Sequence, residues 1–127
     1  ISFRDLPLRQ IHPQAQQAAE AARCVGDQGK FWEYHDALYA SQAKLGAADL
    51  LDQARAIGAD TGEFQECLNS GKFRTQIQKD VEAAALAGVN ATPMFFINGI
   101  QFSGAQPLSA FESVIGPELA RVEANTR

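Results

Sequence analysis

The clearest pattern of apolar and polar positions lies in residues 91–104, Ala-Thr-Pro-Met-Phe-Phe-Ile-Asn-Gly-Ile-Gln-Phe-Ser-Gly. Four consecutive apolar residues, Met94 to Ile97, precede Asn98-Gly99, the pair best suited to a two-residue type I′ turn. Residues 100–103 then alternate apolar and polar, which is the period of a half-buried strand. We therefore predict a β-hairpin here. Its first strand is apolar on both faces, which is typical of a strand inside a sheet that helices cover on each side.

Most of the chain before this hairpin has helical spacing. Phe31, Tyr34 and Leu38 recur at i, i+3 and i+7, and Asp60 and Glu63 have the spacing of a capping box. Glycines follow several of the periodic segments, where helices commonly end. We predict five helices here, from about Pro13 to Gly26, Lys30 to Ser41, Ala47 to Ile57, Asp60 to Gly71 and Phe73 to Ala87. A sixth opens at Pro107, with Leu108, Phe111, Val114, Ile115 and Leu119 facing inward.

The chain starts inside an apparent strand, residues 1–5, so the expected order is strand, five helices, two strands and a helix, which is an α/β chain. Its 127 residues fit one domain. The net charge is −4 and the eleven Lys and Arg residues are scattered, which argues against a nucleic-acid partner. No apolar run approaches the ~20 residues that span a bilayer.

The sequence has few candidates for metal or nucleophilic chemistry. No His, Cys or carboxylate set has the spacing of a metal site, and no glycine-rich phosphate loop or Gly-x-Ser-x-Gly elbow occurs. We expect His12 to be an exposed residue at a helix start and His35 to be a packed, hydrogen-bonded residue. No metal and no cofactor is predicted.

Several segments together resemble a known family. They are His12-Pro13-Gln14-Ala15-Gln16, the Ala-rich stretch that ends at Cys24, Gly29-Lys30-Phe31-Trp32-Glu33-Tyr34-His35, the segment from Phe64 to Lys72, and Thr92-Pro93 before the hairpin. In this order they resemble the DsbA-like thiol-disulfide oxidoreductases of the thioredoxin superfamily, over essentially the whole chain. The resemblance implies one α/β domain of thioredoxin-like fold with an inserted helical part. Residues 1–8 and 88–127 would form the thioredoxin-like part, and 12–87 the inserted part.

The chain also departs from this family. It has no Cys-x-x-Cys motif, because its only cysteines are Cys24 and Cys67. In the family that motif follows a strand and precedes the segment that resembles residues 1–8, and this chain begins with Ile1 in an apparent strand. We therefore expect a fragment that lacks the N-terminal βα unit and contains no catalytic residue. The alternative is a natural relative without redox activity.

The two cysteines allow three interpretations. Either they are two buried, inert thiols, or they form a structural disulfide between the first and fourth helices. The family resemblance implies the structural disulfide, and this is the pairing that we predict. A disulfide requires an oxidising compartment. We do not expect a redox-active pair, because neither cysteine stands at a helix start in a Cys-x-x-Cys motif, the setting that lowers a thiol's pKa.

Thr92 and Pro93 are the predicted substrate-binding residues. The resemblance implies that the Thr92-Pro93 bond is cis and that Thr92 offers its main-chain groups to an extended substrate, a form of strand addition. The alternative is a turn with a purely structural role.

The resemblance implies that the parent protein is an extracytoplasmic, periplasmic or secreted, oxidoreductase that forms or exchanges disulfides in other proteins. Thiolate attack through a mixed disulfide is the expected mechanism, and the chain alone should be inactive. Its expected partners are cysteine-containing proteins and a membrane redox partner. Two alternatives are a non-catalytic peptide-binding module and a relative of the kappa-class glutathione transferases.

A missing central strand would leave open apolar edges, which invite pairing with another chain. We therefore expect one of three outcomes. The chain exchanges strands in a dimer, it retains a cleaved N-terminal peptide, or residues 1–5 shift to pair with the hairpin.

Overall fold

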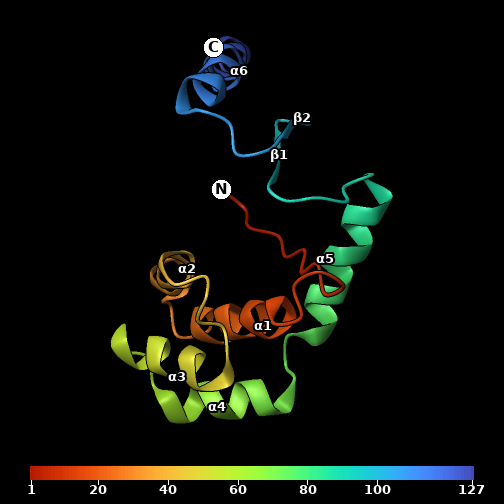
Figure 1. Cartoon of the computed structure of the whole chain (residues 1–127). Helices are drawn as coiled ribbons and strands as arrows, with labels where there is room; N and C mark the ends of the chain where they lie inside the picture. The colour runs from red at the N-terminus through yellow and green to blue at the C-terminus, as the bar shows by residue number, and fades with distance from the viewer. The chain divides into compact units, whose positions relative to one another are not determined.

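The computed structural model describes all 127 residues, which divide into two compact units, Ile1–Gly88 and Val89–Arg127 (Figure 1). The first unit is helical, and the second contains the hairpin and the last helix. The grouping of residues 1–8 with 88–127 as one thioredoxin-like part stays a prediction.

The first unit contains five helices, each within two residues of the predicted bounds. They are α1 (Ala15–Gly26), α2 (Phe31–Ala40), α3 (Ala47–Ala56), α4 (Thr61–Ser70) and α5 (Arg74–Leu86). Helix α1 contacts all four of the others, and this central position explains its alanine-rich sequence, since small side chains allow close approach. The core contains Ala21, Val25, Tyr34, Leu50, Ala54 and Phe64, all fully or almost fully buried.

The ends of α4 follow local sequence signals. At its start, Oδ1 of Asp60 accepts a hydrogen bond from the amide of Glu63 at 2.9 Å, which satisfies one of the free N–H groups of the first turn. At its end, Gly71 has φ of 65°, a left-handed conformation that glycine adopts without the steric cost of a Cβ. The sequence therefore defines where this helix starts and stops.

The expected N-terminal strand is wrong. Residues 1–8 have no regular secondary structure and pair with no strand. Instead, the amide of Asp5 donates to Oδ2 of Asp80 on α5 at 3.0 Å, and the ring of Phe3 packs against Phe31 on α2 at 5.3 Å. Extended backbone forms a ladder only beside a partner strand, and here a side chain takes the place of that partner.

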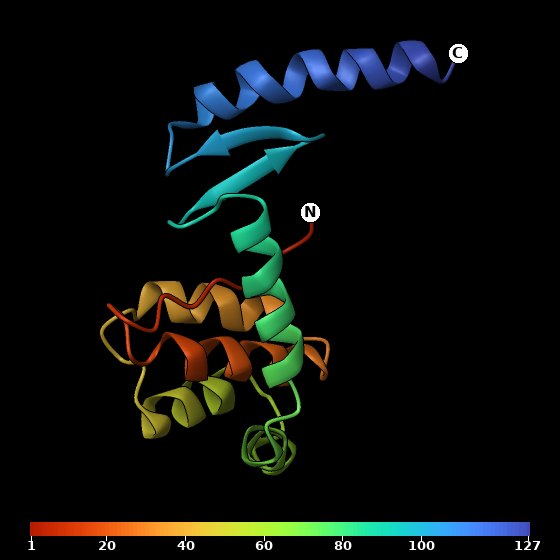
Figure 2. The same ribbon diagram turned by 90° about the vertical axis from the view of Figure 1, so that its right-hand side faces the viewer.

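The second unit is a hairpin followed by a helix (Figure 2). Strands β1 (Met94–Ile97) and β2 (Ile100–Ser103) pair antiparallel, with Phe95 opposite Phe102. Asn98 and Gly99 have φ values of 49° and 86°, as the predicted type I′ turn requires. Helix α6 (Leu108–Asn125) contributes Phe111, whose ring lies 4.9 Å from that of Phe95 and 4.7 Å from that of Phe102.

Two expectations about this unit are wrong. Strand β1 is not buried on both faces, because Phe96 is 52% exposed, on the face opposite that covered by Phe111. On α6, Leu108, Ile115 and Leu119 are exposed, and only Phe111 and Val114 of the predicted inward set are half-buried. One helix on a two-stranded sheet covers one face only, so the rest of this apolar surface stays open.

The sheet of the second unit contains β1 and β2. The three outcomes expected for open sheet edges, which are a strand-exchanged dimer, a retained N-terminal peptide and pairing of residues 1–5 with the hairpin, stay predictions. None of the helices has the length and apolar character needed to cross a membrane.

Candidate functional site

The first candidate site is the loop that leads into β1. Ala91, Thr92 and Pro93 are all exposed, and the Thr92-Pro93 peptide bond is cis. The amide of Gly104 donates a hydrogen bond to the carbonyl of Pro93 at 2.9 Å, which ties the loop to the residue just after β2. The loop is therefore exposed but anchored to the hairpin.

Thr92 has free hydrogen-bonding groups. Its amide and carbonyl make no backbone hydrogen bond within the protein, and β1 pairs on one side only. An extended peptide that continues along this edge would find main-chain donors and acceptors of the kind that strand addition uses. The geometry is compatible with the predicted role of Thr92 and Pro93.

The far end of the hairpin is held to α6 by polar contacts. Nδ2 of Asn98 donates to Oε2 of Glu118 at 3.1 Å, and Arg121 forms a salt bridge with the same carboxylate at 2.6 Å. The hydrogen bond from Arg121, followed by that from Asn98, lowers the pKa of Glu118 below its usual range. These contacts fix the turn relative to the helix.

The second candidate feature is the disulfide between Cys24 on α1 and Cys67 on α4, whose Cα atoms lie 5.8 Å apart. It is the pairing that the family resemblance implied, and it leaves no free cysteine. The two residues are separated by 43 positions. Closing a loop of this size restricts the unfolded chain and contributes about 4 kcal/mol on the chain-entropy account.

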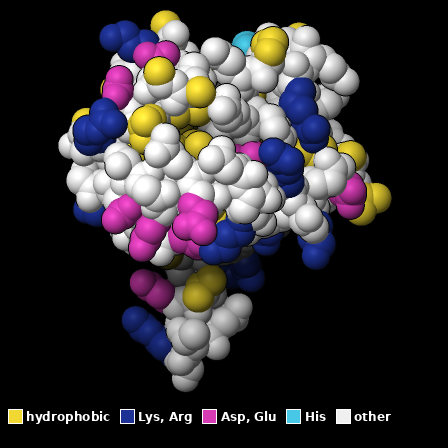
Figure 3. Space-filling model, turned by 90° about the horizontal axis from the view of Figure 1, so that it is seen from below, with side chains coloured by type: hydrophobic (Ala, Val, Ile, Leu, Met, Phe, Trp, Pro, Cys, Tyr) yellow, Lys and Arg dark blue, Asp and Glu magenta, His cyan; other side chains and the backbone are white.

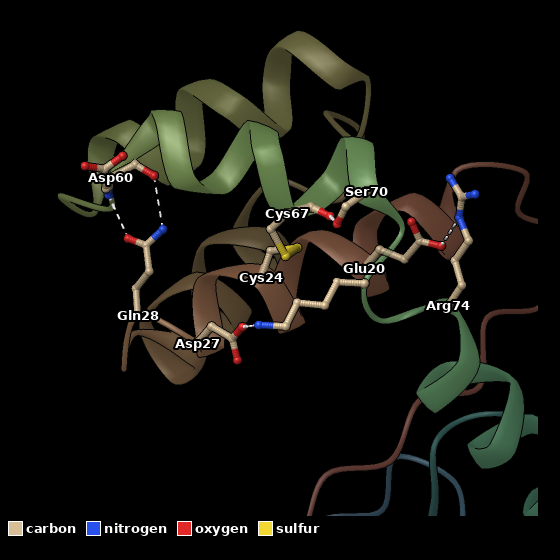
Figure 4. The surroundings of a disulfide bond; sticks show 9 residues. Glu20, Cys24, Asp27, Gln28, Asp60, Cys67, Ser70 and Arg74 are labelled. Carbon is tan, nitrogen blue, oxygen red and sulfur yellow. Dashed lines mark hydrogen bonds and ion pairs between the residues drawn. A yellow bond between two sulfur atoms is a disulfide. The ribbon is translucent and has the colours of Figure 1, made fainter.

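Polar contacts flank the disulfide on the same pair of helices (Figure 4). Gln28 bonds to both main-chain groups of Asp60: its Oε1 accepts from the amide at 2.7 Å, and its Nε2 donates to the carbonyl at 3.0 Å. Lys72, just after α4, forms an ion pair with Asp27 at the end of α1. The α1–α4 contact therefore does not depend on the disulfide alone.

A network of charged groups that the sequence did not reveal holds the N-terminal segment in place. Nε of Arg23 on α1 lies 2.7 Å from the buried carboxylate of Asp5, and Nη1 of Arg4 lies 3.1 Å from that of Asp80. Burial raises the pKa of Asp5 above its ordinary value, although the hydrogen bond from Arg23 opposes this. No sequence signal indicates this network, because its members lie far apart along the chain.

The histidines do not form a site. His12 is exposed, and His35 packs edge-on against Phe3 and Trp32 and bonds to Asp36. The protein has no group of three or more His, Cys, Asp or Glu side chains arranged to hold a metal ion. On the face seen in Figure 3, acidic and basic side chains are interspersed.

The two candidate features lie in different units, the disulfide in the first and the Thr92-Pro93 loop in the second. With its two cysteines bonded to each other, the chain supplies no free thiol as a nucleophile. The geometry is compatible with binding of an extended peptide at the loop, and the disulfide links two helices covalently.

Comparison with known proteins identifies the class. The family described as "Thioredoxin" matches residues 1–116, so the chain belongs to this family. Within it, the chain is similar to DsbA from Mycobacterium tuberculosis. The reduced form of that protein matches with 32% identity and a TM-score of 0.60, over 87% of this chain and 58% of the DsbA chain. The oxidised form matches with a TM-score of 0.57, over 81% and 57%. The fold is therefore thioredoxin-like and of the DsbA type.

Curated relatives have a different name. Na(+)/H(+) antiporter NhaA 1 of Salinispora arenicola is 41% identical over 125 residues, which are 98% of this chain and 19% of that protein. Na(+)/H(+) antiporter NhaA 3 of Salinispora tropica is 42% identical over 113 residues, 89% of this chain and 17% of that protein. The chain thus spans about a fifth of the length of these relatives.

Proposed function

We propose that this chain is part of a thiol-disulfide oxidoreductase of the DsbA type that acts outside the cytoplasm. The observation that carries the proposal is the match to M. tuberculosis DsbA, 32% identical with a TM-score of 0.60. The Cys24–Cys67 disulfide supports an oxidising compartment and counts against the glutathione-transferase alternative. The catalytic Cys-x-x-Cys of the parent protein precedes Ile1 in this proposal.

In this proposal the chain contributes the substrate-holding edge of the active site. An extended substrate segment bonds to the main chain of Thr92 in the exposed loop that precedes β1, while Pro93 directs the loop. The substrate cysteine then meets the catalytic cysteine of the parent protein and forms a mixed disulfide with it.

The relatives named as antiporters support an addition to this proposal. The identity of 41% over 98% of the chain supports a place for the chain as a thioredoxin-like domain within a larger protein of that kind. The gene sequence on both sides of the encoded chain tests this directly. Several flanking apolar runs of ~20 residues would support it, and a complete gene with a Cys-x-x-Cys segment alone would contradict it.

Binding at the loop is tested on the chain itself. Titration of the ¹⁵N-labelled chain with an extended, cysteine-free peptide should shift the amide signals of Thr92 and Met94 and leave those of α3 unchanged. The matched control is the same peptide with alternate backbone amides N-methylated, which keeps the side chains but cannot add as a strand. Equal shifts with both peptides would exclude main-chain recognition.

The activity is tested on the parent protein. Full-length protein should catalyse oxidation of a reduced two-cysteine peptide, and the present chain at equal concentration should not. If the full-length protein is inactive although its Cys-x-x-Cys is intact, the non-catalytic peptide-binding module becomes the better assignment.

A further inference from the structure

The Cys24–Cys67 disulfide faces an open cavity in the surface of the helical unit. The cavity has a volume of about 340 Å³, and the two bonded cysteines are part of its lining. The other lining residues come from the end of α1 and from α4 and the turn after it. They are Asp27, Gln28, Glu63, Glu66, Ser70 and Lys72. A small molecule can therefore enter the space beside the disulfide.

The two cysteine residues differ in exposure. Cys24 is 2% exposed and belongs to the core that α1 forms with its neighbours, whereas Cys67 is only half-buried. A thiolate attacks a disulfide at one sulfur and expels the other, so access decides which sulfur reacts. Both cysteines line the cavity and Cys67 is the more exposed residue, so Sγ of Cys67 is the sulfur that we expect to react.

The cavity also has a charge preference. Asp27 is paired with Lys72, while Glu63 and Glu66 are exposed and form no salt bridge. Two unpaired carboxylates therefore stand beside the disulfide. They repel a thiolate that carries a further negative charge and favour one whose charge is balanced by an ammonium group.

We propose that the Cys24–Cys67 disulfide is a thiol-disulfide exchange site that reacts through Cys67 with small thiols of neutral or cationic character. The site goes beyond the function proposed above, because it uses neither the Thr92-Pro93 loop nor a Cys-x-x-Cys motif. The proposal departs from the expectation that this pair is not redox-active, because exchange at the site requires an accessible sulfur and not a cysteine of lowered pKa.

The exchange is balanced as follows. A thiolate of the small molecule forms a bond to Sγ of Cys67, the Cys24–Cys67 bond breaks, and Cys24 leaves as a thiolate that takes a proton from water. The small thiol is the reductant. A second molecule of it can attack the mixed disulfide, which yields the free Cys67 thiol and the disulfide of the small molecule.

The neighbouring contacts keep α1 and α4 together after the bond opens. The two hydrogen bonds between Gln28 and Asp60 and the ion pair of Lys72 with Asp27 do not involve sulfur. Phe64 of α4 also stays in the core beside Tyr34. Cys24 and Cys67 therefore remain close, and the disulfide of the small molecule can restore their bond by the reverse exchange, in which it is reduced to two thiols.

The test follows the reaction of the intact chain with cysteamine and with 2-mercaptoethanesulfonate, without denaturant and at low salt. Acid quenching, alkylation and peptide mass spectrometry then locate the adduct. Each rate is divided by the thiolate concentration and by the rate at which the same thiol reacts with bis(2-hydroxyethyl) disulfide, an uncharged reference disulfide. We expect the adduct on Cys67 and the alkyl group on Cys24, with cysteamine about five-fold faster at low salt and the difference reduced by added salt.

Two variants test the charge argument. The double variant E63Q/E66Q should bring the two rates close together, whereas E33Q removes a carboxylate from α2, away from the cavity, and should leave the difference unchanged. An adduct on Cys24, or equal rates with the two thiols in the unsubstituted chain, would overturn the proposal. Exchange that appears only with added denaturant would also overturn it, since the disulfide would then react only in the unfolded chain.

Discussion

At the scale of single residues, buried polar side chains hold irregular and helical segments of the backbone in place. Asp5 fixes the N-terminal segment, and the hydroxyl of Tyr34 on α2 donates to the carbonyl of Leu50 on α3 at 2.9 Å. Buried polar groups of this kind are costly when left without a partner. Each interaction therefore gives a measurable effect when one partner is removed.

Asp5 should make stability depend on pH. Because burial raises its folded-state pKa above the 3.8 of an unfolded chain, the folded state binds the proton more tightly than the unfolded state does. The contribution of Asp5 is therefore fully present below pH 3.8 and is lost as pH rises through the folded-state pKa. We expect the unfolding free energy of the wild type minus that of Asp5→Asn to fall over this range in urea titrations. A difference that rises with pH would show that the ion pair with Arg23 outweighs burial.

Tyr34→Phe should destabilise the helical unit by about 1 kcal/mol, because it removes a buried hydrogen bond without opening a large cavity. Tyr39→Phe is the matched control, since Tyr39 is 60% exposed, and its effect should stay within about 0.5 kcal/mol. Burial also raises the pKa of Tyr34, so at pH values above 10 the wild type should lose stability relative to Tyr34→Phe. Urea unfolding at neutral and alkaline pH measures both effects. Equal losses in the two variants would show that the hydroxyl of Tyr34 contributes nothing specific.

At the scale of elements, the predictions that rest on local sequence signals were more accurate than those that depend on tertiary packing. The capping carboxylate of Asp60, the glycine after α4 and the Asn98-Gly99 turn act through their nearest neighbours, and each lies where the sequence placed it. The prediction of an N-terminal strand was wrong because a strand needs a partner strand, which the local sequence does not specify. For α6, the apolar spacing was read correctly as a helix, but which positions are buried depends on how much of the sheet one helix covers.

The glycine after α4 gives a prediction at this scale. Gly71→Ala should cost about 1–2 kcal/mol, because alanine is strained at φ of 65° and its Cβ would lie 2.9 Å from the guanidinium carbon of Arg74. Gly58→Ala is the matched control: its φ is 75° and nothing lies within 4 Å of the added Cβ, so it carries the backbone strain alone. Thermal or urea unfolding should show the larger loss for Gly71→Ala. If the two losses are equal, the side chain of Arg74 moves aside at no cost.

For the whole molecule, the candidate site could be predicted only through the family resemblance. The pairing of Cys24 with Cys67 and the role of the Thr92-Pro93 loop have no signal in composition or periodicity. The sequence also could not show that Asp5, Arg23 and Asp80 meet, or that a cavity opens beside the disulfide, because both arise from packing between distant segments. Whether the isolated chain keeps both units folded depends on how strongly each unit is stabilised.

The two units should differ in local stability. Residues 1–88 contain a core of fully buried side chains and a disulfide, whereas in residues 89–127 only Val89 is buried and α6 has no buried residue. A two-stranded hairpin with one helix buries too little apolar surface for high stability. Amide hydrogen exchange at pH 7 should therefore be at least about ten-fold slower for interior amides of α1 and α3 than for those of β1, β2 and α6.

Phe111→Ala should raise exchange further in the hairpin and leave α3 unchanged, because its ring packs on Phe95 and Phe102 of the hairpin. Equal protection in both units of a monomer would contradict this, and protection of the hairpin that increases with protein concentration would support a strand-exchanged dimer.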